Sequence, residues 1–156
     1  MKITKVFKLI ENNIDDSDFV GQIDISKIKL AESLLQVSFS TDYKLFLNKY
    51  GCGDIFGLEI YGIISDPSSD ANGIPNVIWI TNELRREGLS SSLIPIAEDG
   101  EGNYYVIDVS NSNNSEEEDD KCPVLLWEPV SLKSIYQFEN FGCFLYDILK
   151  EYMCFV

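Results

Sequence analysis

The chain has 156 residues, of which 45% are hydrophobic, and this length and composition suffice for one globular domain with its own core. Its formal net charge is -14; residues 1–50 balance to zero, and residues 51–156 carry the whole excess. A field of that sign repels nucleic acids and anionic membranes, so we expect neither as a partner. It favours a basic protein instead.

The chain contains no histidine, which excludes Ser-His-Asp and Cys-His catalysis, His-liganded zinc and histidine-based acid–base chemistry. The four cysteines, at positions 52, 122, 143 and 154, show neither a Cys-x-x-Cys pair nor zinc-finger spacing, and we interpret them as free, mostly buried thiols. No apolar stretch reaches the ~18 residues of a membrane span, and lysines interrupt the N-terminal residues where a signal peptide would be apolar. These observations favour a cytoplasmic protein without a cofactor.

Apolar residues recur at helical intervals in the first third of the chain and predict three helices. The first covers residues 3–10 and is followed by a polar loop over residues 12–18. Ser26 is the predicted N-cap of the second helix, while residues 40–42 open the third, which Gly51 ends. The expected apolar faces of the first two helices consist of Ile3, Val6, Phe7, Ile10, Ile28, Ala31, Leu34 and Leu35.

Beyond Gly53 the apolar period becomes that of strands. Residues 56–62 alternate as a strand does, and residues 77–87 leave strand and helix both open. Further strands are expected over residues 93–97, 104–109, 124–127 and 132–138, and Asn140 caps a last helix. This order predicts a single α+β domain over residues 1–156, with a central, largely antiparallel sheet of about five to six strands flanked by helices at both termini.

The turn at residues 99–103 places oxygen atoms where a calcium loop begins, but Tyr104 and Ser110 stand where that loop needs Gly and Glu, so we predict a hairpin turn. Nine carboxylates lie between Glu98 and Asp120 without a Lys or Arg. Part of this excess lies in residues 110–121, a polar segment expected to be a mobile acidic loop. Such a loop can serve solubility alone, but the concentration of charge in one hairpin and its exit loop favours a partner surface.

Residues 39–53 are similar to the signature L-P-x-D-Y-K-x-F-L of the SUKH superfamily, which includes the yeast cell-wall-assembly regulator and many bacterial immunity proteins. Ser40 stands where the signature has Pro, and both residue types serve at a helix start. Other pieces that resemble the family follow in the family's order, at residues 56–62, 99–108, 122–127 and 141–149. The order of the pieces over most of the chain carries the resemblance.

The resemblance implies an α+β domain without catalytic activity, and the bacterial members are thought to neutralise toxins, many of them nucleases. An acidic surface that mimics nucleic-acid phosphates would suit such a partner. We therefore predict an immunity protein that binds a cognate, basic toxin domain, with its oligomeric state open. Tyr61 or Tyr104 would supply an aromatic anchor. The residues expected at the interface are Asp54, Glu59, Tyr61, Glu98, Asp99, Glu101, Tyr104, Glu116, Glu117, Glu118, Asp119 and Asp120.

The sequence leaves two other functions open. One is a regulatory protein–protein interaction scaffold like the eukaryotic member of the superfamily. The other is a carboxylate-dependent hydrolase, since the chain is rich in acidic residues. A hydrolase would need a deep pocket with two facing, poorly solvated carboxylates, whereas a binding protein would not.

Overall fold

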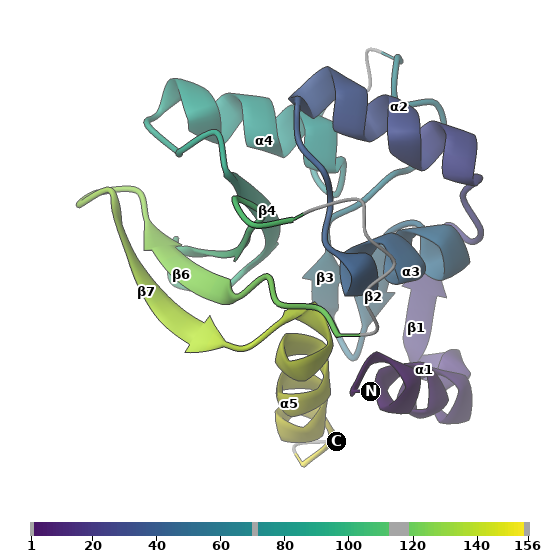
Figure 1. The fold of residues 1–156 in the computed structure, drawn as a ribbon. Coiled ribbons are helices and arrows are strands. Elements are labelled where there is room, and N and C mark those ends of the chain that lie inside the picture. Colours follow the sequence, from purple (N-terminus) through teal and green to yellow (C-terminus); the bar gives the residue numbers. More distant parts are fainter. Residues whose placement is uncertain (1, 70–71, 113–118, 155–156) are drawn as a thin grey trace.

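The computed structural model describes residues 2–69, 72–112 and 119–154, and Figure 1 shows its helices arranged around two sheets. The helices are α1 (Lys2–Asn12), the short 3-10 helix η1 (Ile14–Asp16), α2 (Ile25–Leu35), α3 (Thr41–Tyr50), α4 (Val77–Arg86) and α5 (Phe141–Met153). The strands are β1 (Ser17–Phe19), β2 (Gly53–Ile55), β3 (Leu58–Ile60), β4 (Leu93–Glu98), β5 (Tyr104–Asp108), β6 (Val124–Glu128) and β7 (Lys133–Phe138). The α+β class predicted from the sequence is confirmed.

The strands form two antiparallel sheets, β1-β2-β3 and β4-β5-β6-β7, rather than one central sheet. Phe56 and Gly57 have positive φ angles of 53° and 82°, so the chain reverses inside the stretch expected to be one strand. The result is the hairpin β2–β3, to which β1 adds from a segment predicted as a loop. The two sheets meet where the Tyr61 backbone N–H donates to the carbonyl oxygen of Ile96 at 2.8 Å.

Helices α1, α3 and α5 lie where the sequence predicts them. Gly51 follows α3 with a φ angle of 73°, which a glycine adopts without strain. Asn140 caps α5, because its side-chain oxygen accepts a hydrogen bond from the Cys143 N–H at 2.9 Å. Gly51 and Asn140 were therefore sufficient to predict where α3 stops and where α5 starts.

Helices α2 and α4 differ in detail from the expectation. The N-cap of α2 is Asp24 rather than Ser26, and Leu34 is 47% exposed, so its assignment to the buried face was wrong. The segment left open between strand and helix forms α4, whose first turn is capped where Asn76 accepts from the Ile78 N–H at 3.0 Å. Among the described residues, no helix combines the length and apolar character needed to cross a membrane.

An aromatic cluster joins the helices to both sheets. Tyr43 on α3 packs edge-on against Phe141 of α5, with ring centroids 5.2 Å apart, and donates its hydroxyl to the carbonyl oxygen of Tyr61 at 2.8 Å. Phe144 of α5 packs against Tyr105 of β5 at 4.9 Å. Buried aromatic rings remove large apolar areas from water and pack with defined geometry. This cluster therefore fixes the junction between β3 and β4, next to the surface described below.

All four cysteines are free: Cys52 and Cys122 are buried, Cys143 is half-buried and Cys154 is exposed. Burial raises the pKa of the Cys52 and Cys122 thiols to about 11, and the nearest carboxylates act in the same direction. Both thiols therefore stay protonated near neutral pH, and a protonated thiol is a poor nucleophile.

Candidate functional site

The first sheet places three carboxylates in one row. Asp18 on β1 lies opposite Asp54 on β2, and Asp54 lies opposite Glu59 on β3. Residues directly opposite one another on neighbouring strands project from the same face of a sheet. We call these three residues the acidic row, and all three line a pocket of about 310 Å³. Asp54 and Glu59 were predicted site residues, whereas Asp18 was missed because it lies in a segment predicted as a loop.

Gly53 determines how closely β1 can approach β2. It has a φ angle of +143°, and a Cβ atom at this position would lie 2.1 Å from the carbonyl oxygen of Asp18. A side chain at this position is therefore excluded both by the backbone conformation and by the neighbouring strand. Glycine at this position is what allows Asp18 and Asp54 to face each other across neighbouring strands.

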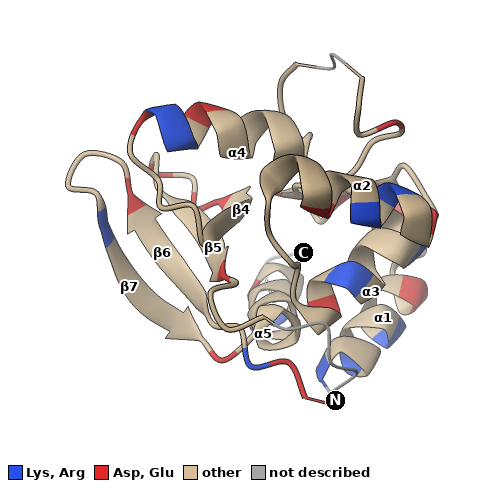
Figure 2. Ribbon diagram, turned by 45° about the horizontal axis from the view of Figure 1, so that its top comes forward, with Lys and Arg blue, Asp and Glu red and all other residues tan. Residues whose placement is uncertain are grey.

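The acidic row is not neutralised within the described part of the chain. The ion pairs found there join Lys49 to Glu11 and Arg86 to Glu83, and neither involves the row. Figure 2 shows Lys and Arg mainly on the helices α1 to α4. Like charges opposite one another destabilise a sheet. A cationic group from another molecule would remove that repulsion.

Glu98 and Tyr104 extend the acidic surface from the first sheet to the second. They lie opposite one another on β4 and β5; Glu98 is exposed and Tyr104 is half-buried. Tyr61 directly follows β3, and its backbone N–H bonds to β4. Burial raises the pKa of its hydroxyl, and the neighbouring Tyr104, Glu98 and Glu59 add to that rise. Tyr61 is only 1% exposed, so its prediction as a surface anchor was wrong. We call the acidic row together with Glu98 and Tyr104 the acidic face.

Asp99 stabilises the β4–β5 turn with its side chain. Its Oδ1 accepts from the Glu101 N–H at 2.8 Å and the Asn103 N–H at 3.0 Å, and its Oδ2 accepts from Asn103 Nδ2 at 3.1 Å. Slight burial acts to raise the pKa of Asp99, but the three hydrogen bonds together outweigh it and hold that pKa below its ordinary value. The predicted hairpin is confirmed, and Glu101 is exposed beside it. Both Asp99 carboxylate oxygens are therefore hydrogen-bonded within the turn.

Asp120 is buried, at 9% exposure, and its prediction as a surface charge was wrong. Its Oδ2 accepts from the Asp42 N–H at 2.9 Å, at the start of α3, and its Oδ1 accepts from the Cys122 N–H at 2.8 Å. The Asp42 carboxylate in turn accepts from the Gly142 N–H at 3.3 Å, in the first turn of α5. Carboxylates are favoured at helix N-termini because they satisfy free N–H groups there. We call Asp42 and Asp120 the buried carboxylate pair.

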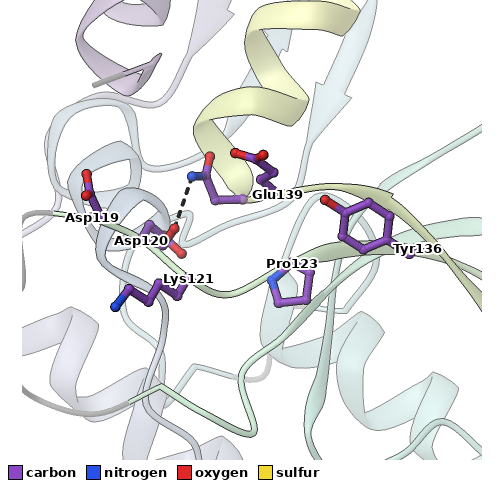
Figure 3. A pocket seen from close by; sticks show the side chains of 7 residues that line it. Asp119, Asp120, Lys121, Pro123, Tyr136 and Glu139 are labelled. Carbon is purple, nitrogen blue, oxygen red and sulfur yellow. Dashed lines mark hydrogen bonds between the residues drawn. The ribbon is translucent and has the colours of Figure 1, made fainter.

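Asn140 also holds the chain that leads into β6. Asn140 Nδ2 donates to the backbone carbonyl of Asp120 at 3.0 Å, as Figure 3 shows. The pocket beside it, about 580 Å³, is lined by Asp120 together with Tyr136 and Glu139. Asp42 does not line that pocket. This pocket therefore does not lie between the two carboxylates.

Sequence comparison assigns this fold to a family. Residues 3–150 match the family described as SUKH_5, SMI1-KNR4 cell-wall. The chain belongs to the SUKH superfamily. The match runs from α1 into α5, so the resemblance noted from the residues is confirmed, and the chain is an SMI1-KNR4-like protein.

The residues of this SUKH domain that carry the resemblance lie mostly in its interior. Phe39, Tyr43 and Phe46 are at most 1% exposed, and Asp42 is 4% exposed. They hold α3 against α5 and against the chain after β3. Asp18, Asp54 and Glu98 of the acidic face lie outside the pieces that resemble the family, whereas Glu59 and Tyr104 lie within two of them.

Part of the predicted interface lies outside the described residues. Glu116, Glu117 and Glu118 lie outside the described residues, and with them the middle of the loop that was predicted to be mobile. Asp119 is exposed next to the buried carboxylate pair. Within the ranges described, no three His, Cys, Asp or Glu side chains lie close enough together to hold a metal ion.

Proposed function

We propose that this SUKH domain is a non-catalytic immunity protein that binds and neutralises a cognate toxin domain with a basic surface, of the nuclease class. One observation carries the proposal: the acidic row sets three carboxylates in cross-strand register, with no ion pair to them among the described residues. Repulsion among the three carboxylates lowers the stability of the free domain. A cationic partner surface would relieve this repulsion, and that relief would favour binding.

The acidic face would act in two ways. Its field raises the rate at which a basic domain meets it in the right orientation, because opposite potentials steer association. Tyr104, half-buried against Trp127 with ring centroids 6.4 Å apart, offers a rigid aromatic contact in the middle of the charges. The bound SUKH domain would then cover the basic substrate site of the toxin, so that nucleic acid could not enter that site.

Two arrangements favour a binding protein over a hydrolase. The buried carboxylates Asp42 and Asp120 accept hydrogen bonds from backbone N–H groups at two helix starts and one loop, which occupies them structurally. In the acidic row Asp18 is exposed, and Asp54 and Glu59 are half-buried. All three therefore keep some contact with solvent, whereas acid catalysis by a carboxylate is favoured in an enclosed, dry cavity that raises its pKa. A regulatory scaffold would use the same acidic face, and the number of distinct partners distinguishes it from an immunity protein.

The test is co-expression of the wild-type chain with basic toxin domains encoded beside its gene. The proposal predicts that one such domain is lethal alone, harmless with the chain, and co-elutes with it as a complex that high salt dissociates. Survival without a complex would contradict the proposal, and so would hydrolysis of the toxin or of its product by the purified chain. Binding of several unrelated proteins with similar affinity would favour the scaffold.

A further inference from the structure

The outer edge of β7 is uncovered. β7 is the last strand in the order β4-β5-β6-β7, and no other strand of the described chain pairs with its outer side. Figure 1 shows no helix or strand beyond it. The opposite edge of the same sheet is closed differently, because the Tyr61 N–H donates to the Ile96 carbonyl on β4. An edge with free N–H and C=O groups is a template for another strand.

The side chains of β7 also lack a covering layer. Its first five residues are all exposed, although neighbouring side chains on a strand point to opposite faces. Ile135 is 52% exposed and Tyr136 is 59% exposed, with Leu132 at 53% just before the strand. A β-branched and an aromatic side chain are the types that pack well across a strand pair. The strand therefore offers both backbone groups and apolar contacts to a partner.

The charges at the two ends of β7 fit a second copy of the same strand. Lys133 begins β7, and Glu139 follows its last residue; both are exposed, and neither is in an ion pair of the described residues. The nearest acid across the sheet, Glu128, accepts a hydrogen bond from Ser131 Oγ at 2.9 Å. Antiparallel pairing of two identical strands brings the start of one against the end of the other. Each Lys133 would then lie beside the other copy's Glu139.

The remaining charge distribution favours the same partner. Lys133 is the one basic residue in the strands β4 to β7, and residues 129–138 contain no acid. Two copies of a chain with a net charge of -14 repel each other across most of their surfaces. On β7, however, they can approach without setting carboxylates against carboxylates. The edge lies on the sheet away from the acidic row, which stays accessible in such an assembly.

We propose that β7 is a homodimerisation edge, on which a second copy of this chain adds its own β7 antiparallel, so that the two four-stranded sheets become one continuous sheet. The interaction is reversible, because it joins one strand edge and a few apolar side chains from each copy. It is independent of toxin binding and holds whether or not the chain is an immunity protein.

Sedimentation velocity over a range of concentrations up to about 1 mM tests the proposal, since even a weak dimer is populated there. The wild-type chain is expected to shift from monomer to dimer as its concentration rises. Lys133→Glu and Glu139→Lys should each weaken the dimer by about tenfold, because each sets like charges together at both ends of the pair. The combined variant Lys133→Glu/Glu139→Lys restores opposite charges and should dimerise nearly as well as the wild type.

Two further variants make the result decisive. Ile135→Lys places a charge on the strand pair and should abolish the dimer, while its exposed position leaves the fold intact, as far-UV circular dichroism would check. Lys5→Glu on α1 is the matched control, since it makes the same charge change at an exposed residue away from β7 and should leave the dimer unchanged. A wild-type chain that stays monomeric, or a dimer that Ile135→Lys and Lys133→Glu leave unchanged, overturns the proposal. A monomeric chain whose toxin binding is lost in Ile135→Lys also overturns it, in favour of a foreign strand on this edge.

Discussion

Asp42 is a buried carboxylate whose ionisation opposes folding. Burial raises its pKa to about 6, and the neighbouring charge of Asp120 adds to the rise, while the hydrogen bond from Gly142 partly offsets it. Asp119, Cys122 and Cys143 are the other titratable groups of the described chain that act on it or feel its charge. Since the folded chain holds this proton more tightly than the unfolded chain, the free energy of unfolding falls as pH rises from about 4 to about 6. The cost then persists at neutral pH.

Asp42→Asn removes this cost and retains an oxygen that can accept from the Gly142 N–H. We expect the variant to be more stable than the wild type at pH 7 by about 1–3 kcal/mol, and the gain to vanish near pH 4. Urea unfolding of both proteins at pH 4, 5, 6 and 7 measures the difference. Asp24→Asn, at the exposed N-cap of α2, is the control and should show no such trend. A gain that is the same at every pH would contradict the role of Asp42 ionisation.

The first sheet depends on a glycine that no other residue can replace. A Cβ atom on Gly53 would meet the Asp18 carbonyl at 2.1 Å, whereas one on Gly57 would meet no atom within 4 Å. Both glycines have positive φ angles, of 143° and 82°. The pair therefore separates the effect of strand contact from the effect of backbone conformation.

Gly53→Ala should destabilise the fold by about 3 kcal/mol or more, because β1 must move away from β2. Gly57→Ala should cost only about 1 kcal/mol, which is the backbone term alone. Chemical denaturation measures both, and hydrogen exchange of the β1 amides should rise in the first variant only. Equal losses in the two variants would show that the contact between β1 and β2 does not matter.

The sequence was a good guide to elements that local chemistry determines. The cap at Asn140 and the turn at residues 99–103 predicted α5 and the β4–β5 hairpin, since each depends on neighbouring residues alone. Residues 40–42 predicted where α3 starts, although the Ser40 side chain makes no capping hydrogen bond and the distant Asp120 accepts from the Asp42 N–H instead. The place of β1 in the first sheet could not be predicted, because β1 is three residues long and pairs with a strand far along the chain. A strand that short, inside a polar segment, has no periodic signal of its own.

The candidate site was predictable in composition but not in arrangement. The sequence indicated acidic residues as the interface, and Asp54, Glu59 and Glu98 lie in the acidic face. Which acids share a face depends on strand register, and that depends on tertiary contacts. Asp42 and Asp120 are separated by 78 residues, so no spacing rule could pair them. An Asp in the first turn of α3 was a signal for a helix start, and its partner could not be inferred from it.

Across the molecule, the residues that carry the acidic surface differ from those that maintain the core. Basic side chains lie mainly on α1 to α4, whereas the acidic face crosses the two sheets beside their junction. The buried signature residues Tyr43 and Phe46 pack α3 against α5, and the Tyr43 hydroxyl bonds to the chain at the junction of the sheets. The core can thus preserve the fold while the residues on the sheet surface determine which partner is bound.

The central claim is that the acidic row binds the basic toxin domain, and the association rate of the two proteins tests it most directly. Asp54→Asn/Glu59→Gln removes two charges from the row, and Asp147→Asn/Glu151→Gln removes two exposed charges from α5. Stopped-flow mixing at low salt should show association slowed by about tenfold for the row variant and little for the α5 variant. The difference should shrink as salt rises. Equal rates for the two variants would contradict the claim, because the row would then contribute only to net charge.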